Sequence, residues 1–121
     1  MAPTTFPPSA DSARGIRYDL TTAVVYIEAT RAVVDLRGEW DVSTRPVLSD
    51  QLSRVIAIGA GDVVIDLAEV TFIDTATVRA LATAQHMLDR VGRRLTIRSP
   101  TRLANQVLHL FGLAELIETR E

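Results

Sequence analysis

The sequence of 121 residues contains no cysteine and no lysine. Without cysteine, disulfide bonds, cysteine-based zinc sites and thiol nucleophiles are excluded. All 13 basic residues are therefore arginines, and with 15 acidic residues they give a formal net charge of −2. The arginines are spread along the chain and form no basic stripe of the kind that nucleic-acid-binding proteins use. We therefore expect no direct contact with nucleic acid.

Long hydrophobic segments are also missing from the sequence. No apolar run approaches the roughly 18 residues that a membrane-spanning helix needs. The N-terminus lacks the basic start and apolar block of a secretory signal. These absences predict a cytoplasmic protein without membrane insertion.

The overall composition is typical of one globular domain. Hydrophobic residues make up 47% of the chain and charged residues 23%, and a chain of this length can bury roughly 60 to 70% of its unfolded surface. Residues 1–20 hold three of the five prolines and no hydrophobic periodicity. We expect a flexible arm over residues 1–20 and a single folded domain over residues 21–121.

Hydrophobic periodicity predicts an alternation of strands and helices. Strands are expected over residues 22–29, 32–40, 63–67 and 94–98, and helices over residues 44–58, 75–91 and 103–111. The first two strands would pair antiparallel, and the apolar tail at 113–117 would add a last turn or strand. The pattern predicts an α/β fold, or mixed α+β if the first hairpin is counted, with a central mixed sheet of four to five strands and three or more packed helices.

Two predicted loops carry the polar residues that suggest a site. Residues 38–44 and 69–77 each connect a strand to a helix, and the carboxyl ends of neighbouring parallel strands meet at one edge of a sheet. If these two strands are neighbours, Asp41 and Asp74 lie close to Thr75 and form a small acidic surface with a hydroxyl group. Asp74 or Thr75 could instead serve only as a helix cap, and Asp41 as a cap or turn residue.

The same residues resemble the STAS domain, a module of sulfate transporters and of bacterial anti-sigma factor antagonists. In that family, a buried strand leads into Asp-Ser-Ser-Gly or Asp-Ser-Thr-Gly. The corresponding residues are Asp66-Leu67, Val70, Phe72 and Asp74-Thr75. The family's second motif, Gly-Glu-x-Asp before a helix, is matched by Gly38-Glu39, Asp41, Thr44 and Leu48. The family's closing helix is matched by residues 108–113.

The resemblance implies a switch at a hydroxyl group. In antagonists of this family, the residue after the motif aspartate is phosphorylated by an anti-sigma factor with kinase activity, which binds the ATP. That residue is Thr75, with Thr77 as the second candidate, although this chain has Thr75-Ala76-Thr77 where the family has two hydroxyl residues and glycine. The unphosphorylated protein would bind the anti-sigma factor and so regulate sigma-factor-dependent transcription. The implied partner-binding residues are Asp41, Ser43, Asp74, Thr75, Ala76, Thr77 and Arg79.

The resemblance implies a binding protein with no catalytic residue, cofactor or metal. Its alternatives are a cytosolic STAS subunit of a lipid ABC transporter and a STAS interaction domain that is no longer phosphorylated. An enzyme using Asp74 and Thr75 is not favoured, because no histidine or lysine lies near in sequence to activate the hydroxyl. His86 and His109 lack a third ligand nearby, Trp40 is expected in the core, and Asp66 is expected to accept backbone hydrogen bonds. The sequence does not determine the oligomeric state.

Overall fold

A computed structural model describes residues 22–118 of the chain, so the arm expected over residues 1–20 lies outside the described part. In chain order the elements are β1 (Thr22–Glu28), β2 (Arg31–Trp40), α1 (Arg45–Ile58), β3 (Val63–Ile73), α2 (Thr75–Asp89), β4 (Leu95–Arg98), α3 (Arg102–Leu110) and the 3-10 helix η3 (Ala114–Leu116). None of the helices within residues 22–118 has the length and apolar character that crossing a bilayer requires.

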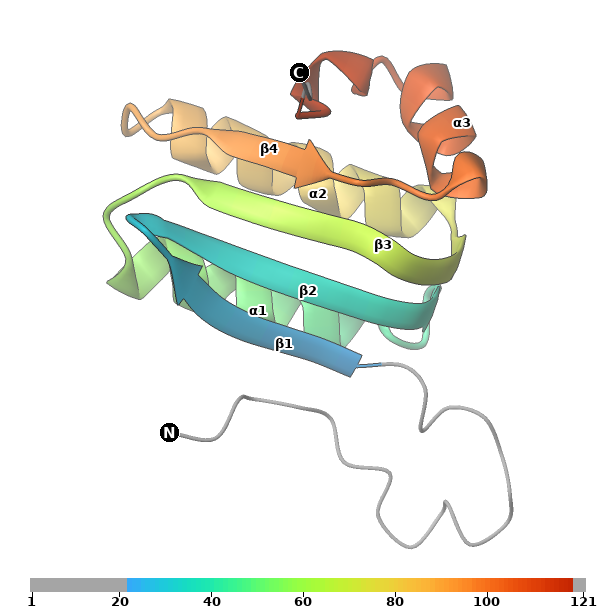
Figure 1. The fold of residues 1–121 in the computed structure, drawn as a ribbon, viewed down its shortest axis with the longest axis horizontal. Coiled ribbons are helices and arrows are strands. Elements are labelled where there is room, and N and C mark those ends of the chain that lie inside the picture. Colours follow the sequence, from blue (N-terminus) through green and yellow to red (C-terminus); the bar gives the residue numbers. More distant parts are fainter. Residues whose placement is uncertain (1–21, 119–121) are drawn as a thin grey trace, which may run out of the picture.

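The four strands form one mixed sheet in the order β1-β2-β3-β4. β1 runs antiparallel to β2, whereas β2, β3 and β4 run parallel to one another. Helices α1 and α2 cover one face of the sheet, and α3 lies beside β3 beyond the end of β4 (Figure 1). This arrangement confirms the predicted mixed sheet with three packed helices, including the antiparallel pairing of the first two strands.

The hydrophobic core lies between the sheet and the helices. Residues of α2 that recur at steps of three and four, Val78, Leu81, Ala84 and Leu88, point into it and are buried. Trp40 at the end of β2 is fully buried in the same cluster, and its Nε1 donates a hydrogen bond of 3.1 Å to the Arg37 carbonyl. The expected core role of Trp40 is therefore confirmed.

The structure corrects the predicted length of β3. The sequence pattern indicated a strand over residues 63–67 followed by a loop, but β3 continues to Ile73. Its second half pairs with the end of β2, where Gly38 with a φ of 92° lies at one of two register shifts. Residues 69–73 therefore belong to the strand, paired with residues 37–40 of β2.

The C-terminal tail forms a turn, one of the two expected alternatives, and adds a single bridge to the sheet. It forms the single turn η3, and Ile117 then makes an isolated parallel bridge with Ile97 of β4. The backbone N–H of Glu118 donates to the carbonyl of Ile97 at 2.6 Å. The tail therefore begins a further pairing at the outer edge of β4 without forming a fifth strand in the described residues.

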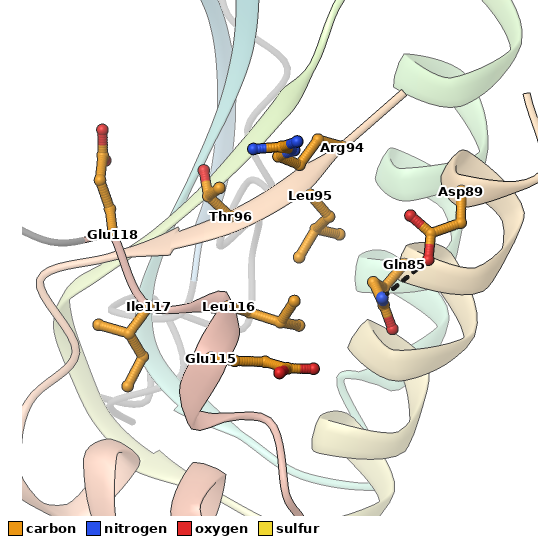
Figure 2. A pocket seen from close by; sticks show the side chains of 9 residues that line it. All are labelled: Gln85, Asp89, Arg94, Leu95, Thr96, Glu115, Leu116, Ile117 and Glu118. Carbon is orange, nitrogen blue, oxygen red and sulfur yellow. Dashed lines mark hydrogen bonds between the residues drawn. The ribbon is translucent and has the colours of Figure 1, made fainter. Parts of the chain in front are cut away.

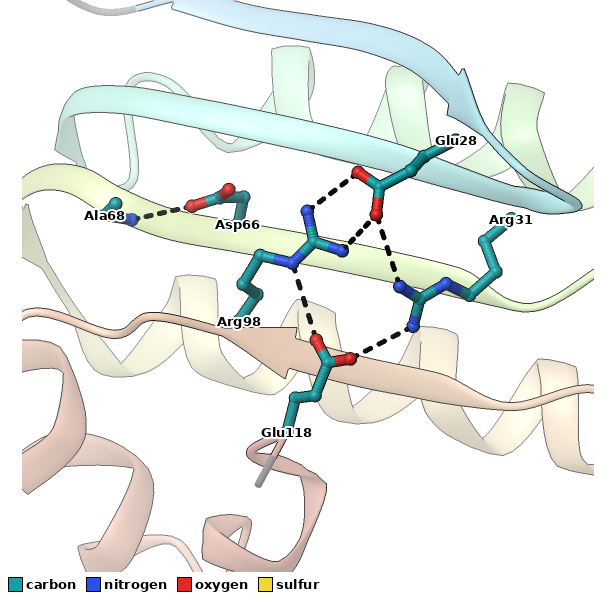
Figure 3. A network of polar contacts seen from close by, with 6 residues as sticks. All are labelled: Glu28, Arg31, Asp66, Ala68, Arg98 and Glu118. Atoms are coloured by element: carbon teal, nitrogen blue, oxygen red, sulfur yellow. Dashed lines mark hydrogen bonds and ion pairs between the residues drawn. The ribbon is translucent and has the colours of Figure 1, made fainter. Parts of the chain in front are cut away.

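A ring of charged side chains crosses the face of the sheet opposite α1 and α2 (Figure 3). It contains Glu28, Arg31, Arg98 and Glu118, each of which contacts two members of opposite charge. Asp66 lies nearby and accepts a hydrogen bond of 3.0 Å from the backbone N–H of Ala68. The expected structural role of Asp66 is confirmed, but the residue lies within β3 and not at its end.

Candidate functional site

The two polar segments of the predicted site meet at the carboxyl ends of β2 and β3. These strands are parallel neighbours, and their last residues, Trp40 and Ile73, are register partners. The backbone N–H of Asp74 donates to the carbonyl of Trp40 at 3.1 Å. Asp41 and Asp74 therefore each follow directly after a paired strand end, as the sequence predicted.

Asp41 organises the turn that leads into α1. Its Oδ1 accepts hydrogen bonds from the backbone N–H of Ser43 at 2.9 Å and from the Ser43 hydroxyl at 2.7 Å. The backbone N–H of Asp41 donates to Oγ1 of Thr44 at 2.9 Å. The Ser43 hydroxyl, followed by backbone N–H donors, lowers the pKa of Asp41. Asp41 therefore holds the turn in place and keeps a negative charge at this corner.

Asp74, and not Thr75, caps α2. Oδ1 of Asp74 accepts a hydrogen bond of 2.9 Å from the backbone N–H of Thr77, and Asp74 occupies the N-cap position with an extended backbone. Thr75 is the first helical residue and is exposed. The capping role considered for either residue therefore belongs to Asp74, which leaves the Thr75 hydroxyl outside the cap.

Thr77 does not lie on the surface of the site. Its exposed fraction is 0%, and its Oγ1 has no hydrogen-bond partner among the described residues. Thr77 and Leu81 lie one turn apart on the inner face of α2. The helical spacing of the apolar residues in the sequence therefore already indicated that Thr77 points inward. In the folded chain the Thr77 hydroxyl is therefore not accessible to a kinase or a partner, so Thr75 is the more accessible of the two candidate phosphate acceptors.

The other predicted residues differ in how much of each is exposed. Ser43 and Arg79 are exposed, whereas Asp41, Asp74 and Ala76 are half-buried. Arg79 lies one helical turn after Thr75, at the spacing that allows two side chains of a helix to interact. Apart from Thr77, the predicted residues together form an accessible polar corner at the start of α2, which we call the Thr75 corner.

Two apolar residues near the Thr75 corner lie outside the predicted site. Val42 lies between Asp41 and Ser43 and is 62% exposed, and Phe72 near the end of β3 is 44% exposed. Large exposed apolar side chains next to polar ones are typical of protein-binding surfaces. Two features of the sequence could have pointed to these residues. Val42 is an apolar residue inside a polar turn, and Phe72 belongs to the family motif.

The described part of the chain offers little for metal binding. No group of three or more histidine, aspartate or glutamate residues within residues 22–118 is arranged to hold a metal ion. His86 on α2 and His109 on α3 are both exposed. His109 Nδ1 lies 2.9 Å from the carbonyl of Asn105 in its own helix.

The family model described as Mlab, STAS domain, matches residues 24–118 of the sequence. The chain belongs to the STAS domain family. A comparison with curated proteins finds no significant match. The matched residues include both strand ends and the whole of α2, so the Thr75 corner lies inside this STAS domain.

Solved structures of anti-sigma factor antagonists share the fold of this STAS domain. The antagonist SpoIIAA in its unphosphorylated form is similar at a TM-score of 0.73 and 19% identity, covering 82% of this chain and 88% of SpoIIAA. An antagonist from Mycobacterium paratuberculosis gives 0.72 at 25% identity, covering 78% and 80%. The phosphorylated form of Bacillus SpoIIAA gives 0.67 at 16% identity, covering 82% and 91%. The STAS fold of this chain is thus the fold of known anti-sigma factor antagonists.

Proposed function

We propose that this STAS domain is an anti-sigma factor antagonist whose binding is switched by phosphorylation of Thr75. The observation that carries the proposal is the position of Thr75. It is exposed at the first residue of α2, and the adjacent Asp74 makes the helix cap. The hydroxyl group can therefore be modified without loss of the cap. In this role the unphosphorylated corner binds an anti-sigma factor and so releases a sigma factor for transcription.

The charges of the corner explain why a phosphate would weaken binding. A phosphothreonine adds about −1.5 to −2 charge at neutral pH. Thr75 follows Asp74 directly and lies close to the Asp41 turn, so the phosphate adds to the charge of two carboxylates. Arg79, one helical turn after Thr75, would offset part of the added charge. The N-terminus of α2 would stabilise the negative phosphate by only roughly 0.3 to 1 kcal/mol. A partner that docks on the corner would have to desolvate this added charge, whereas the fold itself would tolerate it.

The exposed apolar side chains support a protein as the partner. Val42 belongs to the Asp41 turn, and Phe72 lies two residues before Asp74. Both are exposed apolar side chains close in sequence to the polar residues of the corner, and such a mixture is common in protein interfaces. In this proposal the partner is an anti-sigma factor with kinase activity, which binds the ATP, as the likeness to anti-sigma factor antagonists suggests.

The geometry gives no support to catalysis by Thr75 itself. The histidine on the same helix, His86, is eleven residues further on, or about 16 Å along the axis. A threonine nucleophile needs a base within hydrogen-bond reach. We therefore propose a binding module, and the phosphoryl transfer belongs to the partner kinase.

The direct test uses the purified full chain with ATP and each candidate kinase anti-sigma factor of its genome. Mass spectrometry would locate the phosphate, and calorimetry would measure binding. We expect modification at Thr75 and its loss in Thr75→Ala. The matched control is Thr83→Ala, which removes an exposed threonine from the same helix. It should leave both modification and binding unchanged.

A mimic of the phosphate separates the switch from the fold. Thr75→Asp should weaken partner binding at least about tenfold, which corresponds to about 1.4 kcal/mol, while the melting temperature stays nearly unchanged. If no kinase anti-sigma factor binds or modifies the chain, the proposal is wrong. If the partner binds the Thr75→Asp variant as tightly as the native chain, the protein is instead a STAS interaction domain without a switch. Binding to a transporter ATPase would identify the lipid ABC transporter subunit.

A further inference from the structure

β1 forms an outer edge of the sheet (Figure 1). The backbone N–H of Ala32 donates to the carbonyl of Asp62 at 3.0 Å, so Ala32 directs its backbone groups toward β3. The residues on either side of Ala32 direct theirs toward β1 instead, and the register makes one of them the partner of Tyr26. Tyr26 therefore bonds to β2, whereas Val25 and Ile27 direct their backbone groups outward. Within residues 22–118, no strand pairs with this outward side.

The outer edge of β1 is accessible. Ile27 is 70% exposed and Tyr26 is 41% exposed on the opposite face of β1, while Val25 is half-buried. Edge strands are commonly protected by proline, by charged side chains or by bulges. Residues 22–27 contain no proline and no charged side chain, and the register between β1 and β2 runs without a shift. β1 therefore has the features of a strand that can accept another strand.

The other edge of the sheet is different. β4 has four residues, whereas β1 has seven. The tail residues Leu116 and Ile117 lie beside β4 (Figure 2), and Ile117 makes its bridge with Ile97 there. Leu95 of the same strand is only 1% exposed. Within the described residues, the chain thus covers the edge at β4 with its own tail and leaves the edge at β1 open.

The charges of β1 favour an uncharged partner strand. Glu28 is the only charged residue of β1, and it forms ion pairs with Arg31 and Arg98. The edge therefore offers no free charge that would attract a basic or an acidic peptide. It offers an aromatic side chain on one face and branched aliphatic side chains on the other. β1 of a second copy would present the same uncharged set of side chains.

We propose that β1 pairs antiparallel with β1 of a second copy of this chain, about a two-fold axis that passes between the two Tyr26 residues. In this register the backbone groups of Val25 bond to those of Ile27 in the second copy, and the symmetry repeats this pair. The Tyr26 side chains then face each other in a non-hydrogen-bonded pair, a position in which aromatic pairs stabilise a sheet. Each Glu28 lies opposite a Val24, so no like charges oppose each other.

The geometry of β1 excludes the neighbouring registers. An axis at Val25 would require the backbone of Ala23, which is 1% exposed. An axis at Ile27 would require the backbone of Ala29, whose φ of 58° lies outside the extended region. The axis at Tyr26 uses only the outward groups of Val25 and Ile27. This contact is short, so we expect a dimer that forms reversibly as the concentration rises.

The proposed dimer contact is separate from the Thr75 corner. Tyr26 is the register partner of Val33, and β2 runs on from there to Trp40 at the corner. At about 3.3 Å per residue, this part of β2 is about 23 Å long. The two copies of β1 run antiparallel, so the two corners would lie at opposite ends of the joined sheet. Failure of dimerisation would therefore leave the proposed switch untouched, and failure of the switch would leave the dimer untouched.

The test measures the mass of the full chain in solution by analytical ultracentrifugation, from micromolar to millimolar concentration. We expect the average mass to rise toward twice the mass of the chain. Amide hydrogen exchange, followed by NMR over the same concentrations, tests the register. The amide of Tyr26 should be protected at every concentration because it bonds to β2. The amides of Val25 and Ile27 should become protected only as the dimer forms.

A substitution at Ile27 tests the contact without removing a bond to β2. Ile27→Pro deletes an N–H that points outward, a position where an edge strand tolerates proline. It should weaken dimerisation at least about tenfold, because each copy loses a backbone hydrogen bond of the contact. Ile27→Thr is the matched control, since it keeps the N–H and the β-branched shape and should still dimerise. Circular dichroism checks that both variants fold, and hydrogen exchange in the native chain keeps the test valid if Ile27→Pro does not.

Three results would contradict the proposed dimer. It is overturned if the chain stays monomeric up to millimolar concentration, or if Ile27→Pro and Ile27→Thr dimerise equally. Protection of the Val25 and Ile27 amides at every dilution would also overturn it, because another segment of the same chain would then cover the edge.

Discussion

Arg98 on β4 and Glu28 on β1 form a bidentate ion pair that joins the two outer strands of the sheet. The two guanidinium nitrogens lie 2.8 and 3.1 Å from the carboxylate oxygens. Strand register places both residues on the same face as Val33 and Val64 of the two inner strands, and these valines are fully buried. The ion pair therefore spans an apolar strip that α1 and α2 do not cover.

Removing Arg98 should weaken the whole ring, because its guanidinium contacts both Glu28 and Glu118. We expect Arg98→Met to destabilise the fold by about 1 kcal/mol, equivalent to roughly 4 to 8 °C in Tm. The control is Arg54→Met, which breaks an exposed pair with Asp50 on α1 and should change Tm by less than about 3 °C. Thermal unfolding by circular dichroism measures both. Equal effects of the two substitutions would show that the ring has no special role.

The ring also predicts a dependence of stability on pH. Hydrogen bonding to Arg98 is the main cause that lowers the pKa of Glu28 below its ordinary value of 4.5. A carboxyl group with a lowered pKa stabilises the fold above its unfolded pKa and loses this contribution as the pH falls through the folded value. The stability difference between the native chain and Glu28→Gln should therefore be full at neutral pH and shrink below about pH 4.5.

Urea unfolding at several pH values between neutral and about pH 3 would measure this difference. Glu69→Gln serves as the control, since Glu69 is exposed on β3 and does not belong to the ring. A gap between the native chain and Glu28→Gln that stays constant over the whole range would contradict the prediction.

Asp74 should contribute more to stability than Thr75, although the two are adjacent. Asp74→Ala removes the side-chain bond to the N–H of Thr77 and should cost about 1 kcal/mol. Asp74→Ser keeps a capping oxygen and should recover most of this loss. Thr75→Ala should stay within about 0.5 kcal/mol of the native chain. Chemical denaturation measures all three, and a larger loss for Thr75→Ala than for Asp74→Ala would reverse the assignment of the cap.

Thr77 carries a buried hydroxyl that forms no hydrogen bond within the described residues. Thr77→Val keeps the shape and removes the polar group, so we expect it to raise the free energy of unfolding by about 1 kcal/mol. Thr77→Gly, which introduces the residue found in the family motif, should lower that free energy by at least about 1 kcal/mol through lost helix propensity and packing. Destabilisation by Thr77→Val in urea unfolding would reveal a partner for the hydroxyl.

Much of this fold follows from local patterns in the sequence. The recurrence of Val78, Leu81, Ala84 and Leu88 predicted α2. The two strand-to-helix segments predicted that Asp41 and Asp74 would follow neighbouring strand ends. Both outcomes depend on residues close in sequence or on the general geometry of parallel strands. The same helical spacing also indicates that Thr77 is buried. The hydroxyl residues of the family motif favoured a place on the surface for Thr77 instead.

Other features required the register of strands far apart in the chain. The sequence pattern predicts a loop for the second half of β3 because Glu69 and Thr71 interrupt its apolar run, and only pairing with β2 makes it a strand. Glu28 and Arg98 are 70 residues apart and belong to strands that do not pair with each other. The bridge between Ile97 and Ile117 likewise joins residues that lie 20 positions apart in the chain. No local pattern predicts such contacts.

The length of α2 limits how far a change of charge at Thr75 reaches. The field of a helix terminus falls off within about one turn, and salt at about 0.1 M screens charges beyond about 10 Å. Charge added at Thr75 would therefore have little influence at Asp89, about 21 Å further along the axis. A phosphate on Thr75 would therefore change the surface at the first turn of α2 and leave the surface at the last turn of the same helix as it was.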